Sequence, residues 1–225
     1  DFYDEIITHV PMSAHPYPKR ILIIGGGDGI VLREVLKYPS VEYVLMVEVE
    51  SRVIDISRKY LRLDNGGFED PRLQIIISDA ATEIEKINEK FDVIIGDYSD
   101  PYQDLPAGSL VDDRFYSNIY RLLDDSGILS VQSGSPIFQR DIFINIYRLA
   151  KKHFPSVYVF WCPVVYYPGA VWTFIAATKG LDPRLPRTHI KGTTYYNKEI
   201  HRAAFILPEF IRNILRSEAW SSTEA

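Results

Sequence analysis

The chain has 225 residues, of which 46% are hydrophobic and 24% are charged, a composition typical of a globular protein with a sizeable core. Its formal net charge of −5 argues against nucleic acid as a partner, and no apolar run approaches the ~18–20 residues that cross a membrane. The single cysteine, Cys162, excludes an internal disulfide framework and predicts a reducing, cytoplasmic location.

Short β-rich runs alternate with amphipathic segments through most of the chain. The predicted strands are residues 20–24, 43–48, 73–77, 91–95, 127–132, 157–161 and 171–178. The predicted helices are residues 31–38, 51–61, 80–88, 138–154 and 197–216. Apolar strands that alternate with helices are typical of a sheet covered on both faces, so we predict a doubly wound α/β fold with a mostly parallel, seven-stranded sheet. A proline-rich loop joins the last two strands in place of a helix, which predicts that the final strand runs antiparallel.

The first predicted strand ends in a glycine turn, IIGGGDG (23–29). Ligands of such sheets bind beyond the carboxyl ends of the strands, and Gly25, Gly26 and Gly27 let the backbone approach a ligand, although a purely structural turn has the same composition. The turn lacks the Gly-Lys-Ser/Thr of a phosphate loop and the spacing of a dinucleotide fingerprint. Because Asp28 would repel a phosphate, we expect a nucleoside that carries a cationic group.

Acidic residues follow two more of the predicted strands. Glu48 falls twenty residues after Asp28, about where a doubly wound nucleoside site places an acid on the ribose hydroxyls. Asp79 either accepts a hydrogen bond from an adenine amino group or caps the helix that follows it. Together with the glycine turn, these acids predict a nucleoside pocket.

The fourth strand end reads VIIGDYSDP (93–101). Its two carboxylates, Asp97 and Asp100, either shape the turn before Pro101 or join Asp28 in a cluster. Clustered carboxylates raise one another's pKa unless a cation relieves them. No His/Cys set with metal-ligand spacing lies in these turns, so we predict an organic amine, and no metal, as the counter-ion.

Four segments together resemble one family. HPYPKRILIIGGGDGIVLREVLKYPSVE (15–42) is similar to the donor-binding signature of the polyamine aminopropyltransferases, of which spermidine synthase is the type. GDYSDP (96–101) resembles their catalytic turn, YYPGAVW (166–172) the segment that closes over the amine, and YYNKEIHRAAFILPEF (195–210) their C-terminal segment. The resemblance implies the Rossmann-like fold of the S-adenosylmethionine-dependent methyltransferases.

The resemblance also implies a domain organisation. Residues 20–180 are expected to form the catalytic domain, and 181–225 a C-terminal extension packed on it. Residues 1–19 are expected to be a remnant that links to an absent N-terminal β domain, because YDEI (3–6) resembles the family segment that follows that domain. Family members commonly pair, so a homodimer or homotetramer is expected.

The reaction that the resemblance implies moves an aminopropyl group from decarboxylated S-adenosylmethionine, a co-substrate and not a bound cofactor, to an amine, and releases methylthioadenosine. Asp97 is implied as the base that removes a proton from the attacking nitrogen, and Asp28 as the acid that attracts the ammonium of the donor. The residues implied for the acceptor amine are Tyr3, Asp100, Gln132 and Tyr167. The residues implied for the nucleoside donor are Gly25, Gly26, Gly27, Glu48, Val49, Asp79 and Ala80.

Several positions depart from the spermidine synthase pattern. Asp4 stands in place of His or Gln, Ala80 in place of Gly, and Gly134 near the place of a Glu after Gln132. The loop after Pro101 is two residues longer, as in thermospermine synthases, and Pro106 is the loop residue expected to touch the donor. Since these changes enlarge the acceptor side and add carboxylates, we expect spermidine or a longer polyamine as the preferred acceptor, with putrescine as the other candidate.

Two other classes of function fit the same residues. A small-molecule methyltransferase on this fold would use intact S-adenosylmethionine. A non-catalytic polyamine-binding module would bind methylthioadenosine and amines without forming a product.

Overall fold

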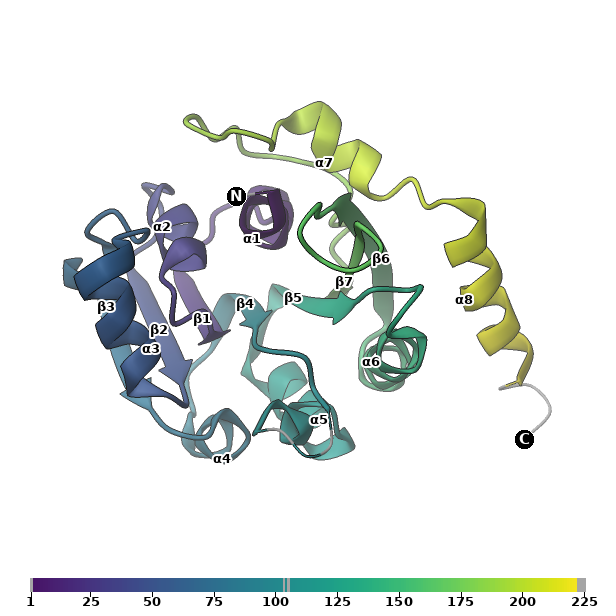
Figure 1. The fold of residues 1–225 in the computed structure, drawn as a ribbon, viewed down its shortest axis with the longest axis horizontal. Helices are drawn as coiled ribbons and strands as arrows, with labels where there is room; N and C mark the ends of the chain where they lie inside the picture. The colour runs from purple at the N-terminus through teal and green to yellow at the C-terminus, as the bar shows by residue number, and fades with distance from the viewer. Residues whose placement is uncertain (1, 103, 105, 222–225) are drawn as a thin grey trace.

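A computed structural model, which describes residues 2–102, 104 and 106–221, contains one seven-stranded sheet with the order β3-β2-β1-β4-β5-β7-β6 (Figure 1). The strands are β1 (Arg20–Gly25), β2 (Tyr43–Glu48), β3 (Leu73–Ile77), β4 (Phe91–Asp97), β5 (Leu123–Gly134), β6 (Ser156–Pro163) and β7 (Val171–Thr178). Strands β1 to β5 pair in parallel, and β7 runs antiparallel to both β5 and β6. The predicted fold class and the antiparallel final strand are confirmed.

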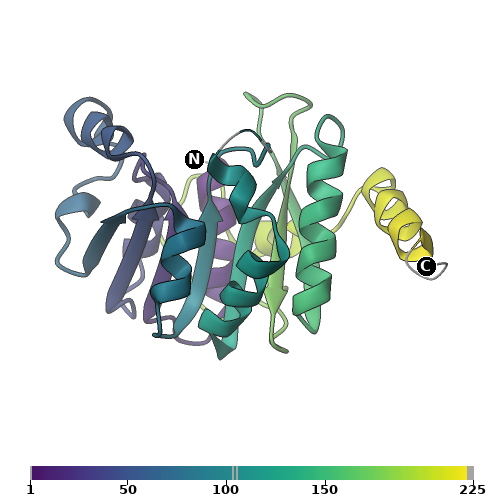
Figure 2. The same cartoon turned by 90° about the horizontal axis from the view of Figure 1, so that it is seen from below.

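Helices cover both faces of the sheet. On one face α4 (Ala80–Lys86), α5 (Asp113–Leu122) and α6 (Arg140–His153) lie side by side, as Figure 2 shows. On the other face lie α1 (Phe2–Ala14), α2 (Ile30–Leu36) and α3 (Ser51–Ile56), which continues into a π-helical turn, η1 (Ser57–Leu61). Two short 3₁₀ turns complete the body, η2 (Gly67–Glu69) and η3 (Pro106–Leu110). None of the described helices is long and apolar enough to cross a membrane.

The central strands are buried on both faces because their apolar side chains alternate between the two helical layers. In β1, Leu22 and Ile24 pack under α4 to α6, whereas Ile21 and Ile23 pack against α1 to α3. The parallel register of β1 with β4 pairs Gly25 with Asp97. The glycine turn and the acidic turn therefore leave the sheet side by side.

Helix α1 is absent from the predicted elements, although it lies over the middle of the sheet and its residues 3–14 are buried. Its apolar side chains Ile6, Ile7 and Val10 belong to the core. Polar residues such as Glu5 and His9 interrupt the apolar pattern, and they are buried because other parts of the chain satisfy them. This is why periodicity alone does not reveal the helix.

The polar residues of α1 bind the segment that precedes α7 (Lys198–Ala204). The Glu5 carboxylate accepts hydrogen bonds from the backbone amides of Thr194, Tyr195 and Tyr196 at 2.7–2.8 Å. The terminal helical segment predicted over 197–216 consists of two helices, because Pro208 separates α7 from α8 (Glu209–Ser221), and α8 extends away from the sheet (Figure 1).

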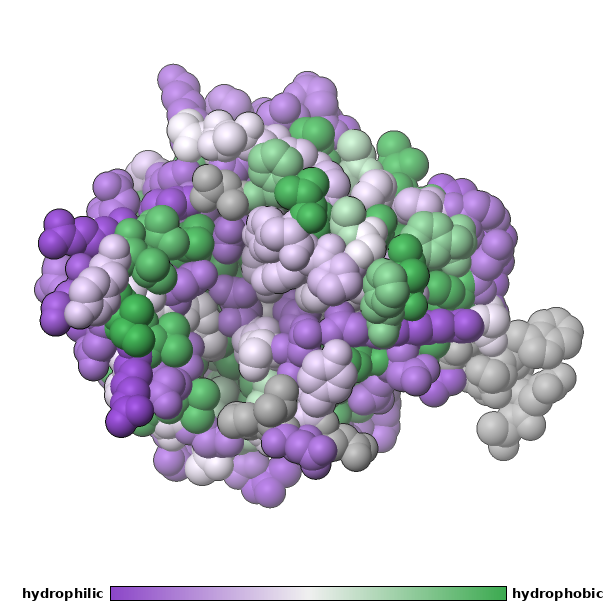
Figure 3. Space-filling view, viewed as in Figure 1, coloured by the Kyte–Doolittle hydropathy of each residue, from purple (hydrophilic) through white to green (hydrophobic). Residues whose placement is uncertain are grey.

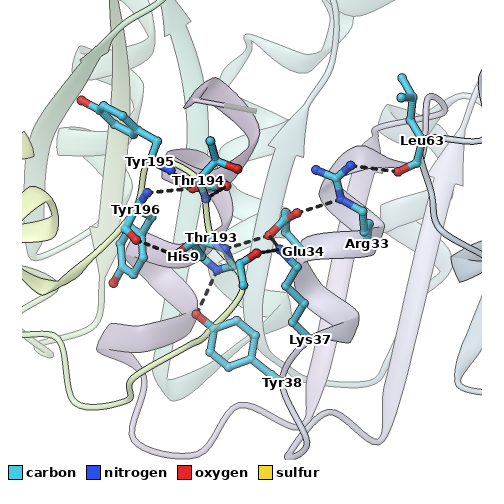
Figure 4. Close-up of polar contacts among 12 residues, drawn as sticks. His9, Arg33, Glu34, Lys37, Tyr38, Leu63, Thr193, Thr194, Tyr195 and Tyr196 are labelled. Atoms are coloured by element: carbon cyan, nitrogen blue, oxygen red, sulfur yellow. Dashed lines mark hydrogen bonds and ion pairs between the residues drawn. The ribbon is translucent and has the colours of Figure 1, made fainter.

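A second buried contact joins α1 to α2. Figure 4 shows His9 between Tyr38 and Glu34. The Tyr38 hydroxyl donates to Nδ1 at 3.1 Å, and Nε2 donates to the Glu34 carboxylate at 2.9 Å. Burial by itself would raise the pKa of Glu34, but hydrogen bonds from His9, Lys37 and Arg33 outweigh it and lower the pKa to about 2.

Candidate active site

A cavity of about 740 Å³ lies beyond the carboxyl ends of β1, β2, β4 and β5. This is the size that small-molecule sites usually have. The space-filling view of this face is hollowed near its centre (Figure 3). The loop between β6 and β7 closes one side of the cavity with Tyr167 and Pro168.

The glycine turn lies directly against the end of β4. Gly25 has a φ of +81°, and a Cβ atom at this position would lie 2.2 Å from the carbonyl oxygen of Asp97. The amide of Gly26 donates a hydrogen bond to that oxygen at 2.8 Å. Only glycine allows this approach, which places the turn beside the Asp97 side chain.

Asp97 is enclosed between α1 and the glycine turn. The Tyr3 hydroxyl donates a hydrogen bond of 2.8 Å to Oδ1 of Asp97. Burial raises the pKa of Asp97 to about 8, and the charges of Asp28 and Asp4 also raise it, while the hydrogen bond from Tyr3 works in the opposite direction. Burial also raises the pKa of Tyr3 well above its usual value, so Tyr3 remains the donor.

The lining of the cavity is strongly acidic. Six of its described residues are acids and none is Lys, Arg or His. The six acids are Asp28, Glu48, Glu50, Asp79, Asp97 and Asp100. Such a lining repels phosphates and carboxylates and attracts cationic ligands.

Comparison with known proteins agrees with this chemistry. A family model described as the spermine/spermidine synthase domain matches residues 1–186. Polyamine aminopropyltransferases from Desulforudis audaxviator and Thermotoga maritima are each 41% identical to the chain, covering 95% of it and 78% and 74% of their own lengths. A crystal structure of spermidine synthase in complex with the transition-state analogue AdoDATO has a TM-score of 0.88 at 40% identity, over 95% of this chain and 75% of that one.

The chain belongs to the spermine/spermidine synthase family of polyamine aminopropyltransferases. The resemblance carried by the sequence motifs is thereby confirmed. The fold that the resemblance implies is also confirmed, because the spermidine synthase of Thermotoga maritima has a TM-score of 0.85 at 39% identity.

The cavity of this family member contains the residues expected for the nucleoside. Glu48 accepts hydrogen bonds from the amides of Gly27, at 3.2 Å, and Glu50, at 3.0 Å. Asp79 caps α4 through a 3.0 Å bond from the Thr82 amide and also lines the cavity, so both interpretations of this residue fit. The other expected donor residues that line the cavity are Gly25, Gly26, Gly27, Asp28, Val49 and Ala80.

The same cavity contains most of the residues expected for the acceptor. Tyr3, Asp100, Gln132 and Tyr167 all line it. The Gln132 side chain donates to the carbonyl of Tyr98 at 3.1 Å and accepts from the amide of Gly134 at 3.0 Å. The rings of Tyr167 and Trp172 are 4.3 Å apart and form one wall.

Asp4 is placed differently from the other expected site residues. Asp4 is only 6% exposed and is not among the described residues that line the cavity, although its charge acts on Asp97. Burial raises the pKa of Asp4, and the neighbouring charge of Asp28 adds to this effect. The side chain of Pro106 lies outside the described residues.

The predicted site omits several lining residues, among them Tyr102, Phe138 and Gln139. Tyr102 and Phe138 are 49% and 67% exposed at the edge of the cavity, and Gln139 donates to Asp100 at 2.6 Å. No sequence pattern marks Gln139, because its contact with Asp100 depends on how two separate loops meet. Among the described residues, no group of three or more His, Cys, Asp or Glu side chains could hold a metal ion.

Proposed function

We propose that the chain transfers the aminopropyl group of decarboxylated S-adenosylmethionine to spermidine or a longer polyamine, with release of methylthioadenosine. The observation that carries the proposal is the position of Asp97, whose pKa is raised to about 8. It lies in a cavity whose described lining has six acidic residues and no Lys, Arg or His. Both substrates of this reaction are cations, and the lining matches them.

Asp97 is proposed as the general base. An alkylammonium has a pKa of about 10, so its nitrogen has no free lone pair at neutral pH. Asp97, with a pKa of about 8, is closer in pKa to that ammonium than an ordinary aspartate is, and it is therefore the better proton acceptor. A cation bound beside Asp97 also favours its ionised form, so substrate binding prepares the base.

The bonds that change are few. The nitrogen forms a bond to the terminal carbon of the aminopropyl group, and the carbon–sulfur bond breaks. The electron pair of that bond goes to the sulfonium, which becomes a neutral thioether, and the nitrogen loses its proton to Asp97. Catalysis then rests on positioning and on the acidic lining, which holds two cations close together.

Selectivity for the donor is assigned to Asp28. Its Oδ1 accepts the amide of Ile30 at 2.9 Å, which fixes the carboxylate at the cavity wall. An acid here opposes the carboxylate of intact S-adenosylmethionine and attracts the ammonium of the decarboxylated donor. Glu48 is proposed for the ribose, Val49 for the adenine face, and Asp79 with Ala80 for the adenine edge. Pro106 remains a proposed donor contact.

The choice of a long acceptor is supported by the edge of the cavity. Tyr102 and Phe138 present exposed aromatic rings next to the acidic interior, and Tyr166 of the β6–β7 loop is 63% exposed. Methylene chains pack on such rings while the ammonium groups reach the carboxylates. A polyamine longer than a diamine uses both features.

Location, domain organisation and assembly are also proposed, on grounds other than the cavity. A cytoplasmic location rests on the single, buried Cys162. The proposed packing of a C-terminal extension (181–225) on a catalytic domain (20–180) is supported by Ala204 and Ile211, which belong to the hydrophobic core on the two faces of the sheet. A homodimer or homotetramer rests on the family alone.

The test is a turnover assay of the purified chain with decarboxylated S-adenosylmethionine and a panel of putrescine, spermidine, spermine and thermospermine. Products are separated by chain length, and Asp97→Asn serves as the matched inactive variant. We expect the highest kcat/KM with spermidine or a longer amine, and a loss of about 10²–10⁴-fold in Asp97→Asn with methylthioadenosine binding retained.

Three results would contradict the proposal in different ways. Turnover with intact S-adenosylmethionine and none with the decarboxylated donor would make the chain a methyltransferase. Binding of methylthioadenosine and amines without product would make it a binding module. A tenfold preference for putrescine, about 1.4 kcal/mol, would leave the reaction standing and overturn the long acceptor.

A further inference from the structure

The side-chain amide of Gln139 contacts three residues that line the cavity. Its Oε1 accepts the backbone amide of Ser135 at 2.9 Å, and its Nε2 lies 2.6 Å from Oδ2 of Asp100 and 3.1 Å from the Tyr102 hydroxyl. The orientation of the amide follows from its partners, because a backbone N–H needs the oxygen and a carboxylate needs the NH₂ group. Gln139 therefore connects the residues after β4 to the residues after β5.

Gly134 provides the space that this arrangement needs. It has a φ of +77°, and a Cβ atom there would lie 2.7 Å from Oε1 of Gln139. A side chain at position 134 would push the amide away from Ser135 and Asp100. The absence of a side chain at Gly134 therefore permits the contacts that Gln139 makes with Ser135 and Asp100.

The amide has a property that a basic residue would lack. It donates a strong hydrogen bond to Asp100 without adding positive charge. Asp100 is thereby held in one orientation while its negative charge remains available to a cation in the cavity. No Lys, Arg or His among the described lining residues competes for that charge.

We propose that Gln139 is a positioning residue for the acceptor polyamine, which holds the Asp100 carboxylate in the orientation that receives an ammonium group. This inference rests on the proposed function, in which Asp100 anchors the acceptor. Gly134 is the neighbour that permits the contact.

The test compares Gln139→Met with the unmodified chain in steady-state assays with decarboxylated donor and spermidine. Methionine keeps the length of the side chain and removes both the NH₂ donor and the oxygen acceptor. We expect the KM for spermidine to rise about 10-fold, as for the loss of a hydrogen bond to a charged group, with the KM for the donor and kcat changed less than about threefold. Gln139→Asn, which is too short to span Ser135 and Asp100, should act in the same direction. Gln74→Met, at an exposed position of β3, is the matched control and should leave the spermidine KM unchanged.

A double-mutant cycle separates positioning from a general structural role. In an Asp100→Ala background, Gln139→Met should change the spermidine KM less than about twofold, because the group that it positions is gone. An unchanged spermidine KM in both single variants, or a full further increase in the Asp100→Ala background, would overturn the inference.

Calorimetric titration of spermidine into the chain saturated with methylthioadenosine distinguishes this inference from the proposed reaction. If the unmodified chain binds spermidine but forms no product, the proposed function fails, and a rise of about 10-fold in the spermidine Kd of Gln139→Met still supports the inference. An equal Kd in both proteins, or no spermidine binding to the unmodified chain, overturns it.

Discussion

Tyr3 donates a hydrogen bond of 2.8 Å to Asp97, 94 positions further along the sequence. The bond lowers the pKa of Asp97 against the larger effects of burial and of neighbouring acids. It therefore tunes the proposed base as well as orienting it.

Tyr3→Phe should move the pH dependence of the reaction upward. The base acts when it is ionised, so kcat/KM rises with pH below the pKa of Asp97, about 8, and levels off above it. Loss of the hydrogen bond raises that pKa, and the rising limb should shift by about one pH unit. The measurement is kcat/KM for spermidine from pH 6 to 9.5. A shift to lower pH, or none, would contradict this role of Tyr3.

Asp28→Asn should move the same profile in the opposite direction. The charge of Asp28 raises the pKa of Asp97, so its removal lowers that pKa and shifts the rising limb to lower pH. The variant should also bind the decarboxylated donor more weakly and discriminate less against intact S-adenosylmethionine. Calorimetry with both donors checks the second part, and unchanged affinities would remove Asp28 from donor selection.

Asp4→His should shift acceptor preference toward putrescine. The Asp4 carboxylate is buried, its charge acts on Asp97, and it adds negative charge beside the cavity. Its replacement removes one attraction for a longer polycation. The ratio of kcat/KM values for spermidine and putrescine measures the effect. An unchanged ratio would mean that Asp4 acts only on the base.

The chain should lose stability as the pH falls from about 6.5 toward 4. Burial lowers the pKa of His201 to about 4, and the neutral ring bridges the hydroxyl of Tyr196 and the carbonyl of Pro183. The unfolded chain binds a proton at His201 below a pH of about 6.5, whereas the folded chain does so only near 4, so stability falls by up to about 1.4 kcal/mol per pH unit from this group.

Urea unfolding at pH 7 and pH 5 measures this dependence, and His201→Gln should be less sensitive to pH than the unmodified chain. Burial also lowers the pKa of His9, so the stability of His201→Gln should still depend on pH to a smaller extent. If the stability of both proteins depended equally on pH, a group other than His201 would be responsible.

The sequence predicted what depends on short-range order. Apolar runs and glycine turns located all seven strands, and the acids at four strand ends line one cavity because parallel strands end at the same edge. Helix α1 escaped prediction because partners about 190 residues away satisfy its Glu5. Gln139 escaped because its contact with Asp100 is made across two loops.

The attachment of Glu5 to residues 194–196 has a consequence for how mutations in this chain are interpreted. Glu5 is not among the described residues that line the cavity, yet it lies two positions from Tyr3 on the same helix. A change that breaks the contact between residues 194–196 and Glu5 is therefore expected to disturb Tyr3, which donates to Asp97. An activity screen would score Glu5 as catalytic, and a binding screen with methylthioadenosine would not correct this, because Asp97→Asn is also expected to keep that binding. Urea unfolding separates the two residues, since the loss of the hydrogen bonds from residues 194–196 to Glu5 lowers the free energy of unfolding.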